Sequence, residues 1–134
     1  MFSVEGVPVP QGSLKHIGNG FIIHNKSKEL KIWREQIGWQ AKESGVEKLE
    51  GAVGMVLLFT LPKPKSVKRD IPYVRPDLDK LVRAVLDALT GIAYSDDGQV
   101  VEIFTRKEYG SQVGLSVTIN QFNPLPKESN STRA

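Results

Sequence analysis

Four aspartates stand in two closely spaced pairs, Asp77 with Asp79 and Asp96 with Asp97, on either side of an apolar stretch. If Asp77, Asp79 and Asp97 met within about 5 Å, each pair would repel by roughly 3 kcal/mol at an effective dielectric of about 20. Such a cluster requires either proton uptake or a bound cation. Because oxygen-only ligands favour a hard cation, the three aspartates predict a Mg²⁺ site that acts beside phosphate.

The same aspartates also have structural interpretations, which the sequence leaves open. Asp77 follows a proline and can cap a helix whose first turn contains Asp79. An anion at such a position gains roughly 0.3–1 kcal/mol. Residues 96–98 have the sequence Asp-Asp-Gly, and these residue types favour a turn. A strand that follows this turn can carry Asp97 back toward Asp77, and the metal site depends on this return.

Charged residues continue along the expected helix at four-residue spacing, as Asp79, Arg83 and Asp87. One interpretation is a ladder of surface ion pairs, each worth roughly 0.2–0.5 kcal/mol. The other places Arg83 beside the metal, where its guanidinium stabilises charge on the phosphate under attack but does not donate a proton. Arg106 and Lys107, on a later strand, are alternative cations for this role.

A basic, proline-rich segment precedes the first aspartate pair. Its prolines at positions 62, 64, 72 and 76 exclude a continuous helix or central strand, so residues 62–76 are predicted to form a long loop. A basic cluster around a few carboxylates suits a polyanion held beside a metal, and the alternative is a solvated loop. The candidate DNA-binding residues are Lys63, Lys65, Lys68, Arg69, Tyr73, Arg75, Lys80 and Lys107.

Composition narrows the class of protein. The 134 residues suit one domain, the net charge of +3 is mildly basic, and the absence of cysteine excludes disulfides and thiolate metal sites. The longest apolar run, residues 52–61, is too short to span a bilayer, and residues 1–10 do not resemble a signal peptide. We therefore expect a cytoplasmic protein with no membrane partner. His16 and His24 have no ligand spacing, and we assign them no metal.

Hydrophobic patterning predicts the elements that must position these groups. Apolar residues at three- or four-residue spacing predict helices over residues 27–44 and 77–90, with Gly91 as a left-handed cap. Strands are predicted over residues 1–7, 51–61, 100–109 and 112–119, with a short strand over 21–24. Gly110 and Ser111 predict a hairpin between the last two strands. Residues 121–134 are polar and are expected to form a flexible tail.

Four segments resemble the RusA family of Holliday-junction resolvases of bacteria and their phages. They are residues 4–10 (VEGVPVP), 75–80 (RPDLDK), 85–91 (VLDALTG) and 94–100 (YSDDGQV), and the last three are specific in order and spacing. The resemblance covers most of residues 1–119. It implies an α+β fold in which a small mixed sheet packs with two main helices. It also implies an endonuclease domain over residues 1–120 and a homodimer that nicks four-way DNA junctions with Mg²⁺.

The resemblance also implies the site residues. The family's acidic residues correspond to Asp77, Asp79 and Asp97, with Asp96 adjacent and Asp87 in a supporting role. Two positions depart from the best-known members, which have Asn in place of Lys80 and Lys in place of Arg83. If that lysine transfers a proton, Arg83 cannot replace it directly, whereas if the lysine only balances charge, Arg83 suffices.

We therefore expect a structure-specific endodeoxyribonuclease that resolves four-way junctions in DNA recombination and repair. Two alternatives stay open. One is a non-catalytic junction-binding dimer whose acidic residues only cap a helix, and the other is a flap or fork nuclease of relaxed specificity. Mg²⁺-dependent cleavage of a mobile four-way junction, compared with a linear duplex, separates the three.

Overall fold

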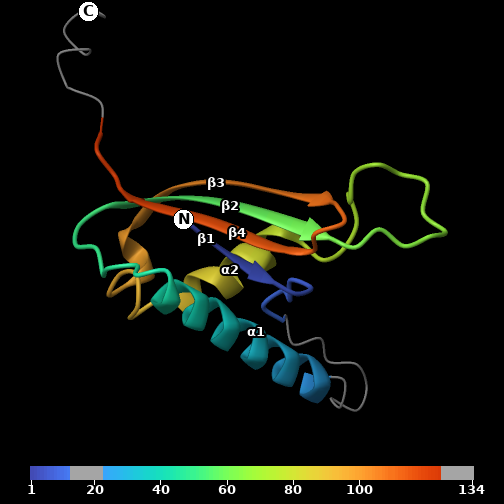
Figure 1. Cartoon of the computed structure of the whole chain (residues 1–134), viewed down its shortest axis with the longest axis horizontal. Helices are drawn as coiled ribbons and strands as arrows, with labels where there is room; N and C mark the ends of the chain where they lie inside the picture. The colour runs from blue at the N-terminus through green and yellow to red at the C-terminus, as the bar shows by residue number, and fades with distance from the viewer. Residues whose placement is uncertain (13–22, 125–134) are drawn as a thin grey trace, which may run out of the picture.

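A mixed four-stranded sheet and two helices form the part of the chain that the computed structural model describes, residues 1–12 and 23–124 (Figure 1). The strands are β1 (Phe2–Glu5), β2 (Val53–Leu61), β3 (Val100–Tyr109) and β4 (Gly114–Gln121). The helices are α1 (Ile23–Glu43) and α2 (Leu78–Leu89), and the short 3₁₀ helix η1 (Asp97–Gln99) precedes β3. The predicted α+β class with two main helices is confirmed.

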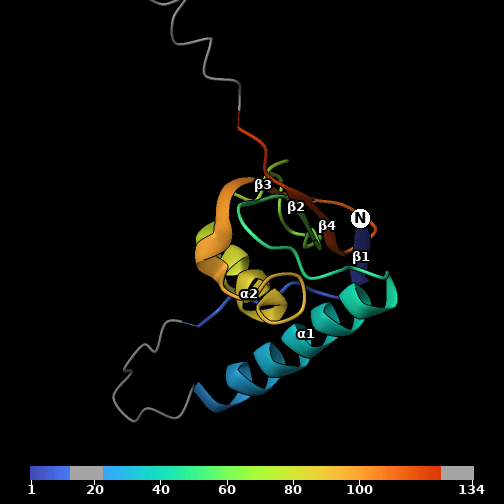
Figure 2. The same cartoon turned by 90° about the vertical axis from the view of Figure 1, so that its left-hand side faces the viewer.

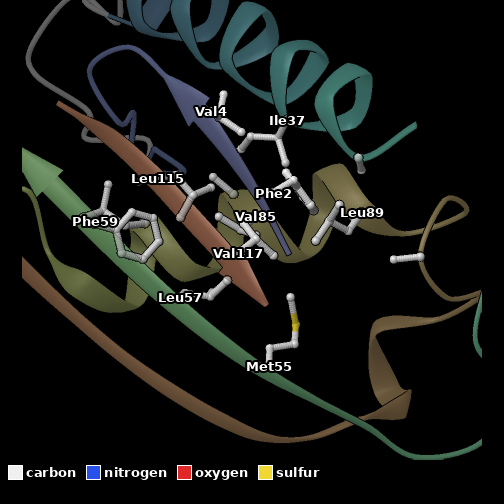
Figure 3. Close-up of a cluster of buried hydrophobic side chains, with 14 of the residues drawn as sticks. Phe2, Val4, Ile37, Met55, Leu57, Phe59, Val85, Leu89, Leu115 and Val117 are labelled. Carbon is white, nitrogen blue, oxygen red and sulfur yellow. The ribbon is translucent and has the colours of Figure 1, made fainter. Parts of the chain in front are cut away.

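Both helices lie on the same face of the sheet, and the apolar core fills the space between the two layers (Figure 2). Apolar residues spaced by four give α2 one buried side, formed by Leu81, Val85 and Leu89. These side chains share one cluster with the inward-facing residues of β2, Met55, Leu57 and Phe59 (Figure 3). Each large apolar side chain buried in this way contributes about 1.5–3 kcal/mol. The packing fixes α2, and with it the residues at its two ends.

The strand order is β1-β4-β2-β3, which corrects the predicted hairpin. β4 pairs antiparallel with β2 on one side, and β3 pairs parallel with β2 on the other. The turn after β3 therefore passes over the end of β2, where the Gly110 amide donates to the Leu61 carbonyl oxygen at 3.1 Å. A Cβ at Gly110 would lie 2.6 Å from Thr60 Cγ2, so a side chain at this crossing would force the Thr60 side chain to shift. A glycine-serine pair indicates a chain reversal. It does not reveal that β2 lies between the two strands, β3 and β4, that the turn connects.

Most element boundaries differ from the predicted ones by a few residues, and two of the differences change an assignment. α1 begins at Ile23, so the short strand predicted over residues 21–24 is wrong for its second half, and its first half lies outside the described residues. β4 runs to Gln121, which pairs with Val53, so the first residue of the predicted tail belongs to the sheet. Residues 125–134, His16 and the side chain of His24 also lie outside the described part. Within that part, no helix is both long and apolar enough to cross a membrane.

Candidate functional site

The first aspartate pair lies at the start of α2. Asp77 is the N-cap residue, yet its side chain makes no capping hydrogen bond, and its carboxylate lies 3.4 Å from the Lys80 ammonium. Asp79 follows in the first turn and has no hydrogen-bond or ion-pair partner among residues 1–12 and 23–124. Both carboxylates are exposed and lie at the positive end of the helix dipole. The structure thus holds two acidic groups at one end of α2 that no capping interaction uses.

The segment that leads into α2 is held by Lys107 of β3. The Lys107 ammonium donates to the carbonyl oxygens of Val74 at 2.6 Å and of Pro76 at 2.7 Å. Both are short, charge-assisted hydrogen bonds, and they use two of the three ammonium hydrogens. The sequence placed Lys107 among the DNA-contacting cations, and the structure gives it contacts with the protein backbone instead.

In the second aspartate pair, Asp96 makes a capping hydrogen bond and Asp97 does not. The Asp96 carboxylate accepts from the Gly98 amide at 2.8 Å, and the Gln99 side chain accepts from the Asp96 amide at 3.0 Å. The Gln99 side chain also donates to the carbonyl oxygens of Leu49 and Gly51, which fastens the turn beside β2. This reciprocal capping accounts for Asp96, so the turn interpretation holds for it. The Asp97 carboxylate is exposed and accepts no hydrogen bond in the described part of the chain.

The turn that carries Asp97 lies toward the opposite end of α2 from Asp77. In Figure 1 this turn is orange, and the loop before α2, at the other end of the sheet, is yellow-green. The turn is anchored by the buried Tyr94, whose hydroxyl donates to the Leu86 carbonyl oxygen at 2.8 Å. Burial raises the pKa of Tyr94 well above its usual range, and the nearby Asp97 carboxylate adds to the rise, while a hydrogen bond with Thr90 opposes it. Tyr94 therefore stays protonated and serves as an anchor, not as a proton acceptor.

The three predicted metal ligands are not gathered within the described chain. No group of three or more His, Asp or Glu side chains in that part is arranged to hold a metal ion. The prediction required the strand after α2 to bring Asp97 back to Asp77. β3 does return to the start of α2, but the residue that it brings there is Lys107. The donor chemistry nevertheless suits Mg²⁺, because the carboxylates of Asp77 and Asp79 offer only oxygen atoms.

Asp87 and Arg83 do not form the predicted ladder of ion pairs. Asp87 accepts from the Gln11 side chain at 2.6 Å and lies 3.6 Å from the Arg34 guanidinium, so it joins the N-terminal segment, α1 and α2. Sequence reasoning misses Gln11 because no local signal points to a partner 76 residues away. Arg83 is exposed, and the described residues include no partner for it. Its guanidinium is therefore available to a phosphate.

The basic loop, residues 62–76, contains both anchored and available cations. Arg69 donates to the Tyr109 hydroxyl at 3.0 Å and lies 5.9 Å from the centre of the Tyr73 ring, so it fastens the loop to the end of β3. Lys63 lies 3.5 Å from Asp70. The exposed loop cations with no partner in the described structure are Lys65, Lys68 and Arg75.

Asp77, Asp79 and Asp97 line neither of the two most prominent hollows of the described chain. A hollow of about 1150 Å³ runs along α1 and β1 and reaches Asp87, but it includes none of Asp77, Asp79 and Asp97. Open surface bearing exposed carboxylates and a basic loop suits a polymeric, phosphate-rich substrate that makes contacts along its backbone. The fold and these groups define a class, that of small α+β proteins with exposed carboxylates beside a basic loop.

Comparison with known proteins identifies the family. The sequence profile of the family described as "Endodeoxyribonuclease RusA" matches residues 4–120. The chain therefore belongs to the RusA family of endodeoxyribonucleases, as its motifs predicted. It is also similar to the "Uncharacterized protein YqaN" of Bacillus subtilis (strain 168). The two are 30% identical over an alignment of 134 residues, which covers 90% of this chain and 94% of that protein.

Neighbouring aspartates 96 and 97 are expected to respond differently to mutation. Asp96→Ala removes the cap of η1, so the free energy of unfolding should fall by about 0.5–2 kcal/mol in urea titrations. Asp97→Ala removes no hydrogen bond in the described structure and should change stability by less than about 0.5 kcal/mol. Equal destabilisation by the two substitutions would give Asp97 a structural role as well.

Proposed function

We propose that this protein is a Mg²⁺-dependent, structure-specific endonuclease that resolves four-way DNA junctions by paired nicks, acting in the cytoplasm in DNA recombination and repair. The observation that carries the proposal is the family match over residues 4–120, a range that contains both aspartate pairs and the basic loop. The charges support it, because the loop with its available cations leads directly into the helix that begins with exposed carboxylates.

Asp77, Asp79 and Asp97 are the proposed metal-binding residues. Their oxygen donors fit Mg²⁺, and in the described chain neither Asp79 nor Asp97 has a hydrogen bond or ion pair that would compete. When bound, Mg²⁺ supplies an activated water and Lewis-acid stabilisation of the phosphate. Asp77 and Asp79 share one end of α2 and could hold the same ion. Asp97 belongs to the turn near the other end of α2 and is not gathered with them in the described chain, so each residue needs its own test.

Arg83 is the proposed catalytic cation. It lies one helical turn after Asp79, and its side chain is exposed. A guanidinium can bind a phosphate through two parallel hydrogen bonds and remains charged at every working pH. Its role is therefore to balance charge on the phosphate during cleavage, and proton transfer is left to other groups.

A cleavage assay on a mobile four-way junction tests the proposed site. Asp77→Asn, Asp79→Asn and Asp97→Asn should each reduce Mg²⁺-dependent nicking to background. Metal-free junction binding should be retained, because each change removes negative charge from a surface that approaches phosphate. Asp70→Asn is a matched control, since Asp70 is an exposed aspartate within the basic loop and lies outside the proposed metal site. A variant of the first three that keeps full activity would remove that residue from the site.

The same assay separates the alternative functions. Wild-type protein should nick the junction and spare a linear duplex of the same sequence. Junction binding without any cleavage would support a non-catalytic junction-binding protein. Equal rates on junctions, flaps and forks would support a nuclease of relaxed specificity.

The loop cations are proposed to hold the DNA backbone, and Tyr73, which is 77% exposed, is available to stack on an unpaired base at the junction centre. Replacing both Lys65 and Lys68 with Gln should weaken junction binding. It should also lower the slope of log affinity against log salt by about 2, because each phosphate contact contributes about 0.9. Replacing the exposed Lys42 and Lys48 with Gln is the matched control. An unchanged slope in the loop variant would identify a merely solvated basic loop.

A homodimer is part of the proposed function, because a four-way junction is roughly two-fold symmetric and needs two related nicks. The helices cover one face of the sheet (Figure 2). On the other face Val56 and Phe104 are register partners, 46% and 63% exposed. Glu102 and Arg106 flank Phe104 along β3. A two-fold axis near Phe104 would bring Arg106 of one copy toward Glu102 of the other, which suits a second copy of this chain.

Sedimentation at micromolar concentration tests this surface. The wild-type protein should sediment at about twice the 14.8 kDa chain mass. Phe104→Asp places a charge at the centre of the interface and should shift the protein to single-chain mass. Trp39→Asp is the matched control, because Trp39 on α1 is 62% exposed on the helical side of the molecule. A wild-type monomer would contradict the dimer, and a dimer that tolerates Phe104→Asp would contradict this surface.

A further inference from the structure

Lys107 connects the end of β3 to the peptide that precedes the candidate site. Its ammonium lies 2.6 Å from the Val74 carbonyl oxygen and 2.7 Å from the Pro76 carbonyl oxygen. The second of these carbonyls belongs to the peptide bond that leads into Asp77. Lys107 is half-buried, and its hydrogen bond to the Pro76 carbonyl oxygen is partly shielded from water, whereas the bond to the Val74 carbonyl oxygen is exposed.

The Asp77 carboxylate contacts Lys80 of its own helix, but the segment before Asp77 is held from outside that helix. An N-cap aspartate is ordinarily fixed by a hydrogen bond from a helix amide to its side chain, and Asp77 has none. The Asp77 carbonyl oxygen accepts from the Lys80 and Leu81 amides, which fixes the chain after this residue. Before it, the Pro76 nitrogen has no hydrogen to donate. The hydrogen bonds from Lys107 hold the chain on this side.

We propose that Lys107 is a positioning residue that determines where the Asp77 carboxylate projects from the start of α2. The importance of this for cleavage rests on the proposed function, in which Asp77 belongs to the site. The alternative role, direct contact with a DNA phosphate, would require the ammonium to give up or share two short hydrogen bonds. Arg69 and Tyr109 form a separate contact farther back in the loop, so a change at Lys107 leaves that anchor in place.

The test compares Lys107→Met with Lys48→Met. Lys48 is an exposed lysine before β2, and it has no hydrogen bond or ion pair within the described residues. In metal-free protein, hydrogen exchange of residues 74–80 should accelerate at least about tenfold in Lys107→Met and remain unchanged in Lys48→Met. Single-turnover nicking at saturating junction should fall about ten- to a hundredfold in Lys107→Met alone. The salt slope of junction binding should not change. Lys107→Arg, which keeps the charge and two donors, should partly restore both exchange and nicking.

Two results would overturn the proposal. A salt slope lowered by about 1 with normal exchange over residues 74–80 would make Lys107 a phosphate contact. Accelerated exchange throughout β2 as well would show a general loss of stability instead of a local effect at Asp77. If wild-type protein nicks no junction, the proposed function fails, while the exchange comparison still decides whether Lys107 positions the start of α2.

Discussion

The apolar inner face of β2 is the constraint on which the rest of the arrangement depends. Its inward-facing side chains from Val53 to Leu61 are almost completely buried, so both helices must cover this face. β2 also lies between β3 and β4, so it sets the direction and position of both neighbours. With α2 packed on this sheet, the end of β3 meets the start of α2. Lys107 is consequently brought to the segment before the helix, and Asp97 stays near the helix's other end.

Local signals in the sequence predict the elements well, and they do not predict which elements become neighbours. The spacing of apolar residues in α2 and the continuous apolar character of β2 each reflect one buried face, so their positions could be predicted. Gly91 takes the expected left-handed conformation, with φ of 89°, because the helix end itself requires it. The strand order and the contact between Gln11 and Asp87 depend on residues distant in the sequence. No periodicity or turn motif encodes that information.

The candidate site follows the same division. The sequence identifies the residue types and the family, and it supplies two interpretations for each aspartate, but only packing chooses between them. Asp96 is used by its turn and Asp87 by contacts with the N-terminal segment and α1. The loop cations divide in a similar way, because Arg69 is an anchor while Lys65 and Lys68 have no partner in the described structure. The number of basic residues counted along the sequence therefore overestimates the number of positive charges that are available to DNA.

Asp77 offers the clearest physical argument for a functional site at the start of α2. A capping hydrogen bond at this position would contribute about 0.5–2 kcal/mol, and the Asp77 side chain does not make it. The Asp77 carboxylate lies instead 3.4 Å from the Lys80 ammonium, an arrangement that leaves it available for the proposed role in metal binding. Carboxylates also repel an approaching phosphate, by about 4 kcal/mol at 4 Å in an effective dielectric of about 20. The Lys80 ammonium offsets part of this repulsion, and the guanidinium of Arg83 can offset more. Two carboxylates facing a polyanion still need a mobile cation between them, which is the electrostatic condition that the proposed Mg²⁺ dependence meets.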